Sequence, residues 1–163
     1  MTHSHEESIV KMDVSSLIGI IEESKWIYVR EHLSIKLHES QIKLLKNVKK
    51  HEKPYHKKIR IEKYSNAEKT DLFLLHEKLY HNKYKKLESK ELVKVDETPY
   101  NGLKYDVTLT EKGKEILTEI SSLEDEWTKV VGITDEDKEM IKNIALNSFD
   151  ITYVHKAKLD FIF

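Results

Sequence analysis

Lysine, histidine, asparagine and serine side chains recur through residues 75–89 at a spacing that places them on one side of a helix. With about 100° of rotation per residue, the apolar residues share one half of such a helix: Leu75, Leu79, Tyr80, Tyr84 and Leu87. The polar residues share the other half: Lys78, His81, Asn82, Lys85 and Ser89. Lysine binds phosphate oxygens and guanine acceptors, and asparagine pairs with an adenine edge. This face suits the major groove of duplex DNA, and the alternative is an ordinary solvated lysine face.

A β-hairpin is predicted directly after this helix. Leu92–Val95 is a short apolar-rich run, and Asn101-Gly102 is the dipeptide that two-residue hairpin turns prefer, because both residues tolerate a positive φ. Apolar and polar residues then alternate over 103–109, which predicts a strand with one apolar and one wet face. The candidate DNA contacts of the hairpin lie at its base, wet face and tip: Lys94, Tyr100, Asn101 and Lys104. The alternative is a purely structural hairpin.

The segments on either side of the hairpin carry a family resemblance. LESKELVKV before it and VTLTEKGKEIL after it resemble the multiple antibiotic resistance regulator (MarR) family and its SarA-type relatives. In that family a recognition helix ends in Leu-x-x-x-Gly-Leu-Val, a wing follows, and Leu-Thr-x-x-Gly opens a long dimerisation helix. The matching positions are Leu87, Glu91, Leu92, Val93, Leu109, Thr110 and Gly113. Glu91 stands where the family usually has Gly, and the wing lacks the family's acidic-Arg signature.

The resemblance is specific over about residues 75–146 and implies a mostly α (α+β) fold, a winged helix-turn-helix with N- and C-terminal dimerisation helices. It implies a homodimer that binds a pseudo-palindromic operator in double-stranded DNA, most often to repress transcription. Many relatives also release DNA on binding a small aromatic ligand. Trp26 and Trp127 are the candidate lining of such a pocket, and the alternative is that both are interface core.

The chain is long enough for one core, so a single MarR-like domain is expected over residues 1–163. Residues 8–33 and 111–163 would supply dimerisation helices, and residues 34–110 the winged-helix DNA-binding lobe. From Ile116 to Val130 the apolar residues step by 4, 3, 4 and 3, which is a heptad seam suited to a partner helix. The candidate dimerisation residues are Val14, Leu17, Ile21, Ile116, Ile120, Leu123, Trp127 and Ile144.

Local signals predict several helix boundaries. Residues 1–7 are expected to form a disordered tail, followed by a helix to about residue 33 and a second from Ser34 to about Lys50. Thr110 and Thr134 are expected to cap later helices, with Gly132 ending the first of these.

The helix-turn-helix turn has two predicted positions. It falls near 64–66, giving an unusually long recognition helix, or near 74–76, giving the family's usual length. Residues 57–64 form either a short helix or a strand.

Charge is unevenly distributed in a chain whose net charge is only −1. Residues 43–63 carry nine Lys or Arg against two Glu, whereas residues 111–139 carry ten acids against four Lys. A basic middle suits phosphate contacts, and a solubilising surface is the alternative. Charged residues make up 35% of the chain and Gly and Pro total only six (4 + 2), which favours long solvated helices.

The residue types disfavour an enzyme. The chain has no cysteine, and its four glycines leave little for a phosphate-cradling loop. His76 and His81 are five residues apart, so a helix separates them by about 140°, and no metal or cofactor is expected. No apolar run approaches membrane-spanning length and the N-terminus is polar, so a cytoplasmic location without membrane contact is expected.

The function expected from these patterns is a dimeric, sequence-specific DNA-binding transcriptional regulator, acting as a repressor. Two alternatives remain open. One is a protein-interaction module that keeps the winged-helix fold without DNA binding, which the missing wing arginine and the near-neutral charge permit. The other is a small-molecule- or metal-sensing regulator.

Overall fold

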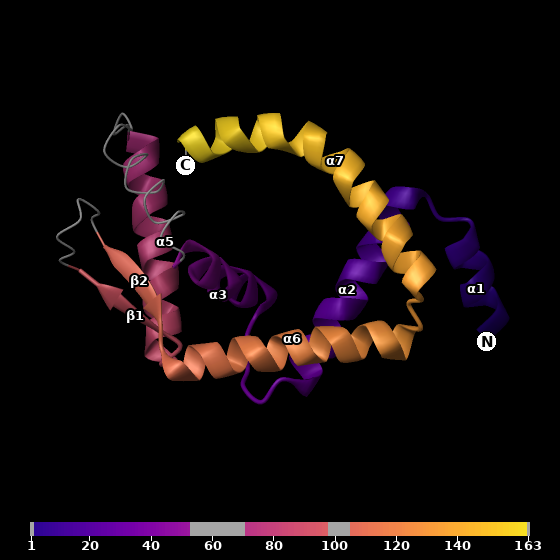
Figure 1. Ribbon diagram of the computed structural model, residues 1–163, viewed down its shortest axis with the longest axis horizontal. Coiled ribbons are helices and arrows are strands. Elements are labelled where there is room, and N and C mark those ends of the chain that lie inside the picture. The colour runs from indigo at the N-terminus through magenta and orange to yellow at the C-terminus, as the bar shows by residue number, and fades with distance from the viewer. Residues whose placement is uncertain (1, 53–70, 98–104, 163) are drawn as a thin grey trace.

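The computed structural model describes the backbone of residues 2–52, 71–97 and 105–162. Figure 1 shows α5 and the β-hairpin at one end of the molecule, α1 at the other, and α6 running between them, while α7 arches over α2 and α3. The elements of the described ranges are α1 (Thr2–Val10), α2 (Val14–His32), α3 (Glu39–His51), α5 (Asp71–Ser89), β1 (Val93–Asp96), β2 (Asp106–Leu109), α6 (Glu111–Val131) and α7 (Asp135–Ile162).

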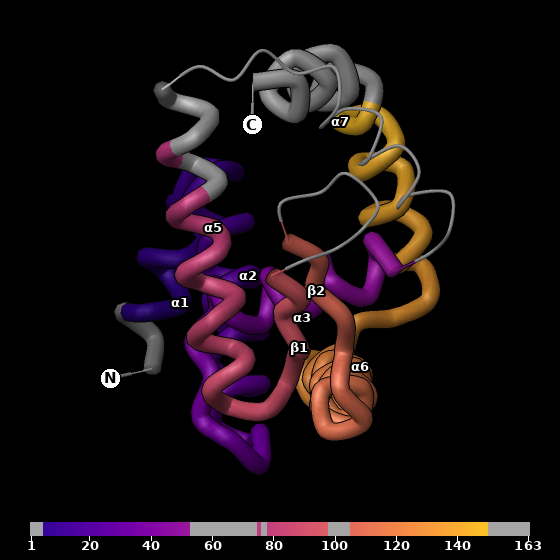
Figure 2. The backbone as a smooth tube through the Cα atoms, turned by 90° about the vertical axis from the view of Figure 1, so that its left-hand side faces the viewer, coloured from indigo at the N-terminus to yellow at the C-terminus, as the bar shows by residue number. Residues whose placement is uncertain are grey.

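The hydrophobic core lies where α2, α3, α5, the hairpin and the first half of α6 meet. Figure 2 shows the hairpin rising from the start of α6 with α5 beside it. Apolar faces of all these elements turn inward, which is the main stabilising contribution to such a fold. The side chains that are fully buried are Val29, Ile42, Leu45, Leu87, Leu92, Val93 and Ile120.

The predicted hairpin is present as an antiparallel pair, in which Val93 is opposite Leu109 and Asp96 is opposite Asp106. The predicted turn at 101–102 lies outside the described residues. One prediction about the strands is wrong: Asp106, placed on the wet face, is only 9% exposed. Its carboxylate Oδ1 accepts a hydrogen bond from the backbone N–H of Val107 at 3.0 Å, which offsets part of the cost of burying it.

The caps predicted around α6 and α7 are confirmed. Thr110 accepts a hydrogen bond from Gly113 N at 3.0 Å, and Gly132 ends α6 in the left-handed conformation with φ 82°. Thr134 and Asp137 form a reciprocal cap at the start of α7: Asp137 N donates to Thr134 Oγ1, and Thr134 N donates to Asp137 Oδ2.

The N-terminal prediction is wrong in two respects. Residues 2–10 form helix α1 rather than a disordered tail, and the helix expected up to residue 33 is interrupted between Val10 and Val14. The interruption is set by Asp13, whose side chain accepts a hydrogen bond from Ser16 N at 2.7 Å and so caps a new helix.

The second helix begins later than predicted. The extended loop from Ser34 leads to α3, which starts at Glu39. His38 caps it: the His38 side chain accepts from Ser40 N, and the Gln41 side chain accepts from His38 N at 3.0 Å. The backbone N–H and hydroxyl of Ser34 instead donate to the Glu119 carboxylate of α6, at 2.6 and 2.7 Å.

Helix α5 excludes one of the two positions predicted for the helix-turn-helix turn. The helix is continuous from Asp71 to Ser89, so the turn does not fall at 74–76. The other position, 64–66, and the segment 57–64 lie outside the described residues. Among the described residues, no helix combines the length and the apolar character that crossing a membrane requires.

Candidate nucleic-acid interface

Helix α5 buries only part of its predicted apolar half, because Leu75 and Leu79 are 54% and 51% exposed. Leu87 is fully buried, and Tyr80 and Tyr84 are half-buried against the core. Of the polar residues selected from the sequence, Lys78, Asn82, Lys85 and Ser89 are exposed and His81 is half-buried. The spacing of the sequence thus places these five side chains together on the solvent side of α5, and their contact with DNA stays a prediction.

The hairpin contributes one described candidate. Lys94 is exposed on β1, opposite Thr108 of β2. The other three candidates, Tyr100, Asn101 and Lys104, lie outside the described residues. The basic surface established for this end of the molecule therefore belongs to α5 and the base of the hairpin.

Two carboxylates that sequence reasoning missed lie against the polar face of α5. Lys85 Nζ is 2.6 Å from Glu88 Oε1 and 3.5 Å from Glu97 Oε1. The hydrogen bond to Glu88 raises the pKa of Lys85. The same bond lowers the pKa of Glu88. The backbone N–H of Val95, which donates to Glu88 at 2.6 Å, lowers it further by a smaller amount. Glu88 therefore joins α5 to β1.

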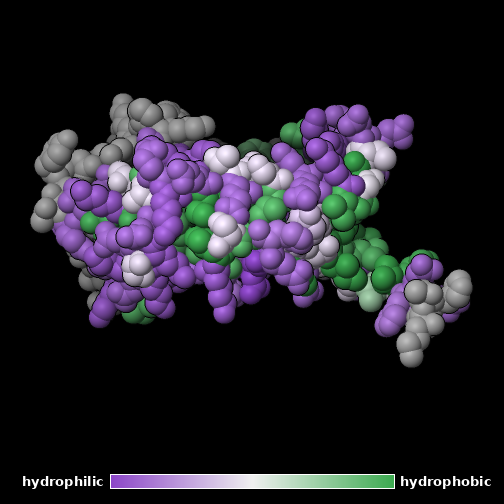
Figure 3. Space-filling view, turned by 90° about the horizontal axis from the view of Figure 1, so that it is seen from below, coloured by the Kyte–Doolittle hydropathy of each residue, from purple (hydrophilic) through white to green (hydrophobic). Residues whose placement is uncertain are grey.

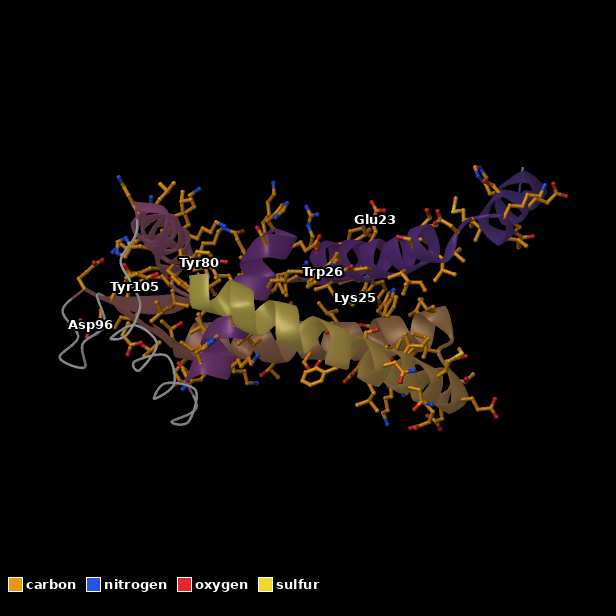
Figure 4. The ribbon with its side chains drawn as sticks, turned by 90° about the horizontal axis from the view of Figure 1, so that it is seen from above. Glu23, Lys25, Trp26, Tyr80, Asp96 and Tyr105 are labelled. Atoms are coloured by element: carbon orange, nitrogen blue, oxygen red, sulfur yellow. The ribbon has the colours of Figure 1, made fainter. Side chains whose placement is uncertain are left out.

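His81 connects the same helix to the hairpin. Its Nε2 lies 3.0 Å from both carboxylate oxygens of Glu97. Its ring meets Tyr105 edge-on at 5.0 Å between centroids, and Tyr105 lies 6.1 Å from Tyr84. Figure 4 labels Tyr80 and Tyr105 at the hairpin end of the molecule. The Glu88–Lys85 pair has a visible three-residue spacing, but nothing local in the sequence indicates that Glu97 meets His81.

The remaining lysines differ in their freedom to bind phosphate. Within the part of the chain that the structure describes, these lysines near α5, the hairpin or the end of α3 have no ion-pair partner: Lys49, Lys50, Lys78, Lys86 and Lys94. By contrast Lys43 pairs with Glu39 at 2.8 Å, and Lys46 pairs with Glu124. Of the described lysines in the basic middle, Lys49 and Lys50 are therefore available to an outside anion, whereas Lys43 and Lys46 are paired.

The residues that carry the family resemblance form the joint between α5, the hairpin and α6. Glu91 adopts a positive φ of 63°, and its carbonyl accepts a hydrogen bond from the hydroxyl of Thr110 at 2.6 Å. Thr110 N donates to Leu92 O at 3.1 Å. A Cβ at Gly113 would lie 2.0 Å from that same carbonyl oxygen, so only glycine fits this crossing.

The dimerisation candidates divide by exposure. Val14, Ile21 and Ile144 are 71%, 56% and 56% exposed. The half-buried candidates are Leu17 and Leu123, and the buried candidates are Ile116, Ile120 and Trp127. Trp127 donates through Nε1 to Ser24 Oγ at 3.1 Å, so the seam of α6 packs on α2 of its own chain. Figure 3 shows apolar surface near the α1 end.

The tryptophans proposed for a ligand pocket are both buried. Trp26 is 5% exposed and belongs to the core, with Lys25 Nζ 4.4 Å from its ring centroid (Figure 4). Both side chains thus pack within their own chain, and their assignment to interface core stays a prediction. Among the described residues, no group of three or more His, Asp or Glu side chains is placed to hold a metal ion.

Comparison with known proteins identifies the fold. Neither a family model nor a curated protein matches the sequence. A solved structure described as "Crystal Structure of MarR" matches with a TM-score of 0.60 at 16% sequence identity, covering 91% of this chain and 96% of that chain. An exposed polar helix beside a two-stranded wing, with long helices around them, is common to the expected and observed architectures. The chain therefore has the mostly helical winged-helix fold of MarR.

Proposed function

We propose that the protein is a dimeric, sequence-specific DNA-binding regulator of transcription that acts as a repressor. The observation that carries the proposal is the exposed polar face of α5, with Lys78 and Asn82 free on it, directly beside the two-stranded wing. A helix of this kind fits the major groove, where lysine and asparagine contact phosphates and base edges. The fold, which matches that of a MarR structure, supports a regulator rather than an enzyme.

The proposal divides one domain, residues 1–163, between two tasks. Residues 34–110 form the DNA-binding lobe, with Lys78, His81, Asn82, Lys85 and Ser89 in the groove and Lys94 at the backbone beside it. Residues 8–33 and 111–163 hold two protomers together through exposed apolar side chains such as Val14, Ile21 and Ile144. Two recognition helices would then meet half-sites about one helical turn apart in a pseudo-palindromic operator.

The proposal is tested by fluorescence anisotropy with the duplex upstream of the protein's own gene and with a random duplex, each at several salt concentrations. Preference for the upstream duplex, weakening steeply with salt, is expected because phosphate contacts release counterions. Lys78→Gln should lower the affinity for both duplexes and make the salt slope shallower by about 1.

Lys129→Gln is the matched control, because it removes the same charge from an exposed position on α6. It should leave the salt slope unchanged. Equal affinity for both duplexes would contradict a sequence-specific regulator, and no measurable affinity for either duplex would favour the alternative of a protein-interaction module.

A further inference from the structure

Glu97 directs its carboxylate at the helix proposed to read DNA. It follows β1 directly, and it contacts two side chains one turn apart on α5: His81 at 3.0 Å and Lys85 at 3.5 Å. These contacts cross from the wing to the recognition helix, so they are not a consequence of helical spacing. Both side chains belong to the face proposed to meet nucleic acid.

We propose that Glu97 competes with backbone phosphate for His81 and Lys85, and so sets how tightly α5 binds a nucleic-acid duplex. The inference rests on the proposed DNA-binding face, but not on its sequence preference. A carboxylate presents two anionic oxygens to hydrogen-bond donors, as a phosphate does. While Glu97 occupies these donors, an incoming phosphate must displace it.

The exposure of Glu97 and Lys85 makes such an exchange accessible from solvent, and His81 is half-buried beside them. The Glu97 side chain is 53% exposed and that of Lys85 is 44% exposed. Exposed ion pairs of this kind are weak, typically below about 1 kcal/mol, so a polyanion with several phosphates can replace one. Glu88 holds Lys85 at 2.6 Å from within the same helix, so Lys85 keeps its place when Glu97 leaves.

The competing explanation is that Glu97 only fastens the wing to α5. The two explanations predict opposite signs. Loss of a structural fastening disorders the wing and weakens DNA binding, whereas loss of a competitor strengthens it.

The test is Glu97→Gln in the full-length protein, titrated into a random-sequence duplex by fluorescence anisotropy over a range of salt concentrations. We expect a several-fold lower Kd at low salt. We also expect the salt slope to steepen by about 0.9 when Lys85 newly engages a phosphate. An unchanged or higher Kd overturns the proposal, provided that the variant unfolds in the same urea range as the parent.

The matched control is Glu115→Gln, which removes an equal charge from an exposed position on α6 that contacts neither His81 nor Lys85. A global charge effect would raise the affinity for DNA equally in both variants, with the same dependence on salt. That result would also overturn the proposal. In a Lys85→Gln background, Glu97→Gln should raise the affinity for the duplex by a smaller factor, because one of the two side chains that Glu97 contacts is absent.

Failure of this inference is distinguishable from failure of the proposed function. If the protein prefers the upstream duplex but Glu97→Gln does not raise its affinity for DNA, Glu97 does not compete with phosphate and the proposed function still holds. If Glu97→Gln raises the affinity for random duplex but the protein shows no sequence preference, Glu97 does compete with phosphate and the sequence-specific regulator is ruled out.

Discussion

Glu91 occupies a backbone conformation that glycine adopts at far lower cost. Its φ of 63° lies in the left-handed region, where a Cβ approaches the following carbonyl, and non-glycine residues there cost about 1–3 kcal/mol. The neighbours leave no freedom to relax, since the Glu91 carbonyl accepts the Thr110 hydroxyl and Leu92 N donates to Leu87 O at 3.2 Å. The strain is therefore held by the same hydrogen bonds that join α5 to α6.

We predict that Glu91→Gly stabilises the protein by about 0.5–1 kcal/mol, because it relieves the left-handed strain and the greater freedom of unfolded glycine offsets only part of that gain. The pair that is lost, with Lys112 at 3.5 Å, is exposed and contributes little. The measurement is the free energy of unfolding in urea at fixed protein concentration.

The control for this change is Glu115→Gly, which places glycine inside α6 and should cost about 1 kcal/mol. If Glu91→Gly unfolded at a lower urea concentration than the parent, the left-handed conformation would not be a source of strain.

At the scale of elements, Glu88 links α5 to the wing. Its carboxylate accepts from Lys85 of the same helix and from Val95 N of β1. Both bonds favour the charged form, and they lower the pKa of Glu88 below its ordinary value of 4.5. In the unfolded chain these partners are lost, so folding and deprotonation of Glu88 support each other.

We predict that Glu88→Gln lowers the free energy of unfolding at pH 7 and that its difference from the parent narrows as the pH falls below 4.5. The folded pKa is the lower one, so the contribution is complete above the unfolded pKa and disappears as the pH falls through the folded pKa. Urea unfolding of both proteins across this pH range measures the difference. A constant difference would show that the Glu88 charge does not link α5 to β1.

The sequence predicted those elements whose signals are local. Thr110, Gly132 and Thr134 cap helices through contacts within three or four residues, and each was identified. The start of α3 was misplaced because His38 is an unusual cap, and its bond to Ser40 gives no strong pattern. Burial of Asp106 depends on where the hairpin packs in three dimensions, so alternation along one strand does not predict it.

The seam of α6 shows a related limit. Ile116, Ile120 and Trp127 were assigned to a partner helix, because a heptad spacing identifies which face is buried. It does not identify what covers that face. In the structure elements of the same chain cover it: Ile116 and Ile120 belong to the hydrophobic core, and Trp127 donates a hydrogen bond to Ser24 of α2. Likewise, the pairing of Glu97 with His81 joins residues of two elements and follows only from their packing.

At the scale of the whole molecule, apolar side chains remain uncovered at the end away from the wing. On α7 the exposed apolar residues are Met140, Ile141, Ile144, Leu146 and Phe149. On α1, α2 and the turn between them they are Ile9, Val10, Met12, Val14, Ile18, Ile20, Ile21 and Ile27. An apolar surface this extended is typical of an interface, and it lies at the end where the proposed dimer requires one.

The proposed function assigns dimer assembly to the apolar end and DNA contact to α5, so a substitution at the apolar end should weaken the dimer directly and DNA binding as a consequence. We predict that Ile144→Glu weakens the proposed dimer, because a carboxylate would replace an apolar side chain, 56% exposed in the single chain, at the proposed interface. Light scattering after size exclusion should then report the monomer, with circular dichroism showing that helices persist. Affinity for a two-half-site duplex should fall much more than affinity for a single half-site, because the two helices no longer bind together. The control is Leu79→Glu, at a 51% exposed position on α5, which should leave the dimer intact. If the Ile144→Glu protein were still dimeric, the interface would lie elsewhere.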